Sequence, residues 1–96
     1  MIKNFNLATK LERSPHAVCS KVGEETVILH LENGTYYGLD SLGTRVWELL
    51  EKGTTVPEIC NALLPKYKVS AGILNADITA FVLEMRSHDL VFTDQT

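Results

Sequence analysis

Histidine and cysteine have the broadest chemistry of the residue types in this chain, because they act as general bases, nucleophiles and metal ligands. They are scattered along the sequence at His16, Cys19, His30, Cys60 and His88. His16 and Cys19 are close enough to share a metal, but no neighbouring residue supplies the third and fourth ligands that a zinc site needs. We therefore expect surface or half-buried imidazoles and no metal site.

The sequence motifs of covalent catalysis and phosphate binding do not occur in the chain. There is no G-x-S-x-G motif, no G-x-G-x-x-G motif and no P-loop. Cys19 and Cys60 lack CxxC spacing, and we expect buried free thiols, although the sequence leaves a disulfide open. We predict no catalytic residue and no cofactor, and hence a protein that is not an enzyme.

Length, composition and charge narrow the class of protein further. The 96 residues suffice for one domain, and 45% hydrophobic and 22% charged residues are ordinary for a globular protein. No apolar run approaches the ~20 residues of a membrane span, and the N-terminus lacks the pattern of a secretory signal. We expect a cytoplasmic protein that does not bind membranes. The formal charge of −3 and the scattered basic residues count against nucleic-acid binding.

The sequence predicts three strands, which help to position any binding site in the chain. They span residues 16–22, 26–31 and 35–39. Asn33 and Gly34 predict a tight type I′ hairpin turn, which needs positive φ at both positions. Short strands with tight turns form an antiparallel meander, so the third strand is expected at an edge of the sheet. In the second strand we expect alternate residues to face the core, namely Val27, Leu29 and Leu31, with Thr26, Ile28 and His30 facing outward.

Three helices are predicted after the strands, each with a local start or stop signal. Asp40 or Ser41 caps the first helix, and Gly53 ends it. Thr55 and Glu58 form a capping box for the second helix, and Pro65 ends or bends it. In the first helix Trp47 is expected to anchor the core, and Gly43 to allow a close backbone approach.

The third helix is predicted over residues 70–88. Its apolar residues repeat at helical spacing as one stripe, at Leu74, Ile78, Phe81, Val82 and Met85. Residues 89–92 leave this helix extended and apolar, and either add a small strand or pack under the core. The order predicts an α+β domain of the winged-helix kind, a three-stranded antiparallel sheet followed by three helices. We place an N-terminal arm at 1–13, the domain at 14–92 and a tail at 93–96.

Two adjacent tyrosines, Tyr36 and Tyr37, lie on the third predicted strand. In the simpler interpretation, one packs in the core and the other covers the opposite face of the sheet. The alternative is functional, because an edge strand with aromatic side chains suits a peptide that adds a further strand. A groove between this strand and the third helix would then have an apolar floor.

The segment 34–50 resembles the signature region of PqqD-like proteins, which are also called RiPP recognition elements. It fits the pattern Gly-x-Tyr-Tyr-x-Leu-[Asn/Asp]-x-x-Gly-x-x-[Val/Ile]-Trp-x-Leu-Leu. The resemblance extends over roughly 14–91 and includes the opening of the second helix at Thr55 and the acidic-then-apolar stretch 77–85 of the third helix. Asp40 stands where Asn is common, but both residues cap helices. The resemblance implies three strands, three helices and a non-catalytic domain that binds the leader of a precursor peptide.

The resemblance also implies a binding site. The leader would add a strand to the third β-strand, with its side chains against the third helix. Carried over to this chain, the contacting residues are Thr35, Tyr36, Tyr37, Gly38, Leu39, Ile78, Phe81, Val82, Met85 and Arg86. The implied partners are the leader segment and a leader peptidase or other modifying enzyme.

Three functions remain open at this point. Similarity to the stand-alone proteins of lasso-peptide biosynthesis favours presentation of the leader to a peptidase. The alternative within the family is a carrier of the precursor peptide in the synthesis of the quinone cofactor PQQ. A winged-helix DNA-binding regulator is the rival of a different class, and it is disfavoured because the third helix carries Arg86 as its one basic residue.

Overall fold

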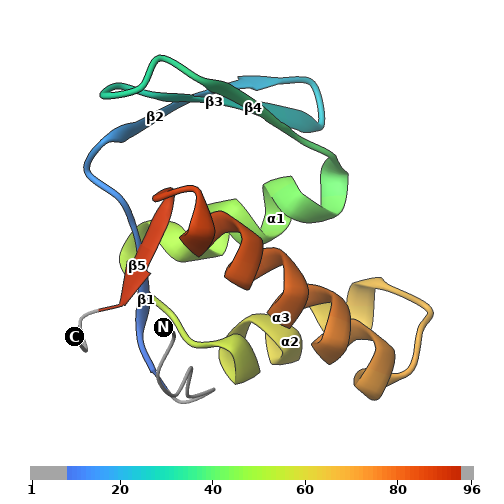
Figure 1. Ribbon diagram of the computed structural model, residues 1–96. Helices are drawn as coiled ribbons and strands as arrows, with labels where there is room; N and C mark the ends of the chain where they lie inside the picture. Colours follow the sequence, from blue (N-terminus) through green and yellow to red (C-terminus); the bar gives the residue numbers. More distant parts are fainter. Residues whose placement is uncertain (1–8, 94–96) are drawn as a thin grey trace.

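The computed structural model describes residues 9–93, and the expected arm and tail therefore lie largely outside the described residues. A three-stranded antiparallel sheet, in the order β2-β3-β4, covers one side of α1 (Figure 1). Helices α2 and α3 pack together on the other side of the molecule. The strands and helices have the bounds β1 Leu11–Arg13, β2 Ala17–Val22, β3 Glu25–His30, β4 Tyr36–Leu39, α1 Ser41–Leu49, α2 Val56–Leu63, α3 Ala71–Ser87 and β5 Val91–Thr93. Short 3-10 turns, η1 Leu50–Lys52 and η2 Leu64–Lys66, follow α1 and α2.

The predicted helix signals are confirmed. Asp40 caps α1 by accepting a hydrogen bond from the Gly43 N–H, and Gly53 follows η1 with φ +82°. Thr55 and Glu58 form both hydrogen bonds of the capping box. Helix α2 ends at Leu63, and Pro65 falls in η2. The structure adds a cap that the sequence analysis does not predict: the Ser70 side chain accepts a hydrogen bond from the Ile73 N–H at the start of α3.

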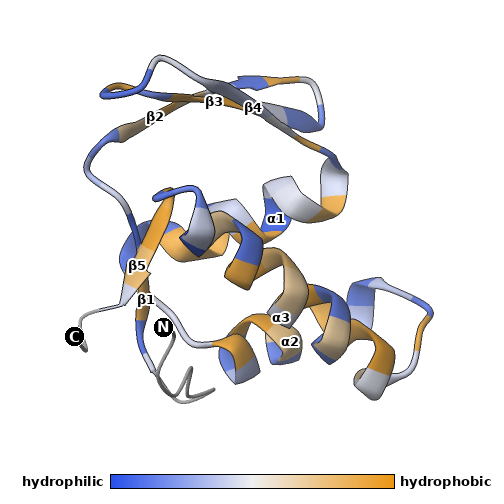
Figure 2. Ribbon diagram, in the orientation of Figure 1, coloured by the Kyte–Doolittle hydropathy of each residue, from blue (hydrophilic) through white to orange (hydrophobic). Residues whose placement is uncertain are grey.

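The core lies mainly among the three helices and the β1 and β5 segments, and Ile28 and Leu39 extend it to the three-stranded sheet. Figure 2 shows apolar segments in every helix and in β5. Trp47 is 1% exposed, as predicted, and Arg13 lies over its ring while donating two hydrogen bonds to the Trp47 carbonyl oxygen. Leu11, within the expected arm, is fully buried in this core, together with Leu90 and Val91. The buried stripe of α3 comprises Leu74, Ile78, Val82 and Met85.

A second small sheet joins the two ends of the described chain. Strand β1 pairs antiparallel with β5, and Leu11 also forms an isolated bridge with Thr54 (Figure 1). Of the two possibilities left open for residues 89–92, both apply in part: the segment leads into strand β5, and Leu90 and Val91 pack in the core, whereas Phe92 is exposed. The pairing closes the domain by placing residues after α3 beside residues before β2.

The predicted facing of β3 is wrong. Thr26, Ile28 and His30 point inward and are buried, whereas Val27 and Leu31 are exposed. Apolar residues occupy both sets of alternate positions, so hydropathy does not decide the register. The polar residues that face inward have partners there: the Thr26 hydroxyl donates to the Thr44 hydroxyl oxygen at 2.9 Å, and His30 pairs with Asp89.

The predicted type I′ turn is also wrong. Gly34 has φ +72°, but Asn33 is not among the described residues with positive φ. Residues 31–35 form a wider loop in which the Gly34 N–H donates to the His30 carbonyl oxygen at 2.9 Å, and the Thr35 N–H to Asn33 Oδ1 at 2.9 Å. Two further N–H groups of the loop, those of Glu32 and Asn33, donate to His30 Nδ1. A two-residue turn is too short to place both of these groups against the ring.

Candidate functional site

The open edge of β4 is the first component of the candidate site. Among residues 9–93, no strand pairs with the side of β4 that faces away from β3. The His30 N–H donates to the Thr35 carbonyl oxygen, and hydrogen-bonded pairs alternate along an antiparallel ladder. The register pairs Ile28 with Tyr37, so Tyr37 belongs to the set that bonds to β3. Tyr36 and Gly38 therefore direct their N–H and C=O groups toward the open edge.

The two tyrosines take different environments. Tyr36 is 69% exposed on the outer face of the sheet, whereas Tyr37 is partly buried against the core. The Tyr37 ring lies 5.0 Å from the ring of His88, the residue that caps the C-terminal end of α3. This contact brings the start of β4 next to the end of α3.

A pocket of about 330 Å³ lies between α1 and α3, next to the point where β4 ends. Gly43 makes the approach of the helices possible, because a Cβ atom there would lie 3.1 Å from Phe81 Cε1 and 3.3 Å from Leu39 Cβ. The predicted close approach at Gly43 is thus directed at α3 and the end of β4. The lining residues are Asp40, Leu42, Gly43, Val46, Asp77, Ile78, Ala80, Phe81 and Glu84.

The predicted residues of α3 divide into three groups. Ile78 and Phe81 line the pocket, and Phe81 is partly buried. Val82 is fully buried and Met85 is 4% exposed, so both side chains belong to the core beneath the cleft. Arg86 is half-buried on the same helix, away from the pocket lining. Of residues 35–39, the last four form β4 with its open edge, and Thr35 directly precedes this strand.

Sequence reasoning missed most of the pocket. The predicted site residues do not include Leu42, Val46, Asp77 and Glu84, all of which line the pocket. Asp77, Phe81 and Glu84 are spaced for one helix face, which was the available signal. Three exposed acidic residues, including Asp40, therefore surround an apolar floor. Such a rim repels phosphate and suits a peptide with basic or neutral side chains beside its apolar ones.

The potential nucleophiles do not gather into a site. Both cysteines are free, and the expectation that both are buried is wrong, because Cys19 is exposed and Cys60 is only partly buried. Its position on the outer strand β2 leaves it uncovered by any helix. Burial raises the pKa of the Cys60 thiol above its ordinary value, which favours the unreactive protonated form.

One group of side chains has the composition of a metal site. His16, His30 and Asp89 place one potential ligand atom each within 4.8 Å of one another. The expectation of surface or half-buried imidazoles fails for His30, which is 3% exposed. The three residues are far apart in sequence, so no local spacing of residues predicted this group.

None of the helices in residues 9–93 has both the length and the apolar character needed to cross a membrane.

Comparisons with known proteins find one matching family and similar solved structures. The sequence profile of the family described as coenzyme PQQ synthesis protein D (PqqD) matches residues 25–91. Among solved structures, TbiB1 in complex with the TbiA(beta) leader peptide is similar, with a TM-score of 0.80 and 33% identity over 88% of this chain and 96% of that chain. A lasso peptide synthetase B1 complexed with the leader peptide has a TM-score of 0.73 and 20% identity over 85% of this chain and 96% of that chain, a likeness of fold. No curated protein sequence matches the chain.

Proposed function

The chain belongs to the PqqD family, and on that premise we propose that it is a non-catalytic module that recognises the leader region of a ribosomally made precursor peptide. It presents the bound precursor to a partner leader peptidase or other modifying enzyme. The observation that carries the proposal is the open edge of β4 beside an apolar pocket with an acidic rim. The edge supplies backbone hydrogen bonds and the pocket supplies selectivity for side chains.

In the proposed complex the leader pairs antiparallel with residues 35–39 and extends β4 outward. Tyr36 and Gly38 form the new backbone hydrogen bonds, because their polar groups point to the open edge. Gly38 assists, since a Cβ built on it meets no atom within 4 Å and the edge is unobstructed there. An apolar side chain of the leader enters the pocket over Phe81, while Val82 and Met85 support the floor from the core.

Lasso-peptide biosynthesis is the pathway that we propose. Both similar solved structures hold a leader peptide, and one of them is described as a lasso peptide synthetase B1. The PQQ pathway is the alternative within the family. A precursor gene beside genes for a leader peptidase and an asparagine-synthetase-like cyclase supports the first, whereas genes of quinone-cofactor synthesis support the second. Either pathway places the protein in the cytoplasm, where the precursor is made.

Amide hydrogen exchange tests the proposed binding mode directly. The probe is a synthetic peptide with the leader sequence of the precursor encoded beside this gene, called the cognate leader below. Adding it should slow exchange at Tyr36 and Gly38 much more than at Tyr37, whose N–H already bonds to β3. The matched control is the other open edge of the sheet, where the Cys19 and Lys21 amides of β2 should be unaffected.

Unchanged exchange along β4 in the presence of a tightly bound leader would exclude this binding mode. Incubation of the chain with the full precursor should give no change of mass, and processing should begin only when the partner enzyme is added. A change of mass with the chain alone would contradict a non-catalytic role.

A further inference from the structure

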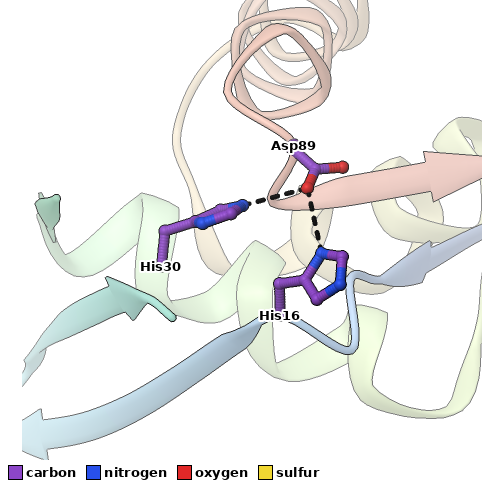
Figure 3. A group of neighbouring side chains, drawn as sticks. All are labelled: His16, His30 and Asp89. Atoms are coloured by element: carbon purple, nitrogen blue, oxygen red, sulfur yellow. Dashed lines mark hydrogen bonds and ion pairs between the residues drawn. The ribbon is translucent and has the colours of Figure 1, made fainter. Parts of the chain in front are cut away.

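Two histidines share one carboxylate oxygen at the C-terminal end of α3 (Figure 3). His30 Nε2 lies 2.9 Å and His16 Nδ1 lies 3.3 Å from Asp89 Oδ2. His30 ends β3, His16 directly precedes β2, and Asp89 follows α3. The group, named here the His–Asp clamp, therefore joins the sheet to the end of the helix that borders the proposed cleft.

The hydrogen-bond partners of His30 define its protonation. Its Nδ1 atom accepts from the Glu32 N–H at 3.2 Å and the Asn33 N–H at 3.3 Å. This nitrogen must therefore carry the lone pair, and the proton resides on Nε2, where it is donated to Asp89. The neutral ring satisfies all of its partners, which suits its nearly complete burial.

His16 differs from His30, because both of its ring nitrogens face carboxylate oxygens. Its Nδ1 atom faces Asp89 Oδ2 at 3.3 Å, and its Nε2 atom faces Glu32 Oε2 at 3.3 Å. A neutral imidazole has one N–H for its hydrogen bond with Asp89, whereas the imidazolium ion also forms an ion pair with the Glu32 carboxylate. Protonation of His16 thus links the loop after β3, through Glu32, to the segment after α3.

The backbone at Asp89 supports a role for its side chain. Helix α3 ends in a Schellman motif: the Leu90 N–H donates to the Met85 carbonyl oxygen and the Asp89 N–H to the Arg86 carbonyl oxygen. Asp89 has φ +59°, the left-handed conformation for which glycine is the usual residue. A glycine would end the helix with less backbone strain but would leave both histidines without their shared acceptor. Hydrogen bonds from His30 and then His16 hold the pKa of Asp89 below its ordinary value.

The clamp lies next to the proposed peptide cleft. His88, adjacent to Asp89, packs on Tyr37 of β4 with the ring centroids 5.0 Å apart. A movement of the segment after α3 would therefore change the separation of α3 from β4. Besides its three members, Glu32 in the loop after β3 contacts the clamp, 3.3 Å from His16 Nε2, and the titratable groups next to it are His88, adjacent to Asp89 in sequence, and Tyr37, which packs on His88.

We propose that His16, His30 and Asp89 are positioning residues that fix the C-terminal end of α3 against the sheet, and that protonation of His16 tightens this contact and strengthens leader binding. The part that concerns the leader rests on the proposed function. Protonated His16 bridges Asp89 and Glu32 as an ion pair with each, whereas the neutral ring carries no charge to hold both carboxylates. Leader affinity should rise as the pH falls from 8 to 6.

A metal ion is the competing explanation for the same three residues. A metal bound to His30 Nε2 would shift the ring proton to Nδ1, which would then face the two N–H donors of Glu32 and Asn33. In typical metal sites the second ring nitrogen donates to an acceptor, and the arrangement here is the reverse. The hydrogen-bonded clamp is therefore the better fit to the geometry, and zinc becomes an outcome of the test.

The experiment compares the wild type with three variants: His16→Gln, Asp89→Asn and His88→Gln. Asn tolerates the left-handed backbone as Asp does, and His88→Gln is the control for the other histidine near the cleft. The dissociation constant for the cognate leader is measured from pH 6 to 8 in EDTA. We expect the wild type to bind about two- to fivefold more tightly at pH 6, the size expected for a partly exposed ion pair. The dependence should vanish in His16→Gln, weaken in Asp89→Asn and persist in His88→Gln.

A second measurement does not involve the leader. Protection factors of the Leu90 and Asp89 amides in the free protein should fall in Asp89→Asn and His16→Gln, and in the wild type they should be higher at pH 6 than at pH 8.

Wild type that fails to bind the cognate leader at either pH refutes the proposed function, and the clamp is then judged by the protection factors alone. Equal protection in all variants, or a pH dependence of affinity that survives in His16→Gln, overturns the clamp. Stoichiometric zinc binding that is lost in His16→Gln and Asp89→Asn overturns it in favour of a metal site.

Discussion

At the residue scale, the buried polar groups show how the sheet is attached to the first helix. Thr26 of β3 and Thr44 of α1 are 3% and 2% exposed, and their hydroxyl groups are 2.9 Å apart. Both hydroxyl groups are removed from water on folding, and their mutual hydrogen bond offsets the free-energy cost of desolvating them. The pair explains why a polar residue of β3 can face inward.

Replacing one member of this pair should destabilise the protein more than replacing both. Thr44→Val leaves the Thr26 hydroxyl buried without its partner, at an expected cost of about 1–3 kcal/mol in the free energy of unfolding. The double variant Thr26→Val/Thr44→Val removes both hydroxyls and should recover most of the loss. Urea denaturation of the two single variants and the double variant measures this. Losses that simply add would show that the hydroxyl pair is not coupled.

The carboxyl group of Asp89 predicts an acid dependence of stability. Its pKa is lowered in the folded protein by hydrogen bonds from His30 and then His16, so folding favours the ionised form. Such a group contributes stability above its unfolded pKa of about 3.9 and loses that contribution as the pH falls through the lower folded value. The difference in unfolding free energy between wild type and Asp89→Asn should therefore shrink below about pH 4. Chemical denaturation from pH 6 downward checks this, and a difference that grows below pH 4 would contradict it.

At the element scale, the cleft depends on how closely α1 approaches α3 and the end of β4. A helix interior ordinarily prefers alanine to glycine by about 0.5–1 kcal/mol, yet α1 has Gly43 at the point of contact. An added Cβ would lie 3.1 Å from Phe81 Cε1 and 3.2 Å from Asp40 Oδ1. The absence of a side chain thus keeps Phe81 in place at the pocket wall.

Gly43→Ala should weaken binding of the cognate leader by displacing the Phe81 ring into the pocket, while the gain in helix preference offsets part of the crowding. Gly72→Ala is the matched control, because a Cβ built on Gly72 in α3 meets no atom within 4 Å. That variant should keep the affinity of the wild type and gain up to about 1 kcal/mol in stability. Calorimetric titration and thermal unfolding of both variants provide the comparison. Wild-type affinity in Gly43→Ala would show that the leader does not use this pocket.

At the scale of the whole molecule, charge separates peptide recognition from the winged-helix alternative. The chain has a net charge of −3, and the pocket carries the carboxylates of Asp40, Asp77 and Glu84 at its rim. Duplex DNA would meet this surface with repulsion, whereas a peptide strand is held by backbone hydrogen bonds and apolar contacts. The domain therefore shares strands and helices with DNA-binding folds without their electrostatics.

Salt should distinguish the two kinds of ligand. Affinity for the cognate leader should change only modestly with ionic strength, because strand pairing and apolar burial are not screened as ion pairs are. A DNA-binding protein with several phosphate contacts would lose roughly 10³–10⁵ in affinity between about 50 and 200 mM salt. Titrations with the leader and with duplex DNA at two salt concentrations test this. Salt-sensitive binding to the duplex, with none to the leader, would reverse the assignment.

The sequence alone determined the elements and most of their ends. The Asp40 cap, the capping box at Thr55 and the stop at Pro65 act within one or two helical turns, so their signals are local and the sequence predicts them. The edge position of β4 also followed from the order of three short strands. The signature in 34–50 identified the family because it combines these local features with Trp47.

The tertiary structure decided which faces and which distant residues meet. The inward face of β3 depends on Thr44 and Asp89, which supply partners for Thr26 and His30. The histidines of the clamp are 59 and 73 positions from Asp89, and no local pattern predicts such a meeting. The pocket likewise arises from the packing of α1 against α3. These features depend on long-range packing, which hydropathy and helix signals do not encode when several registers bury comparable apolar surface.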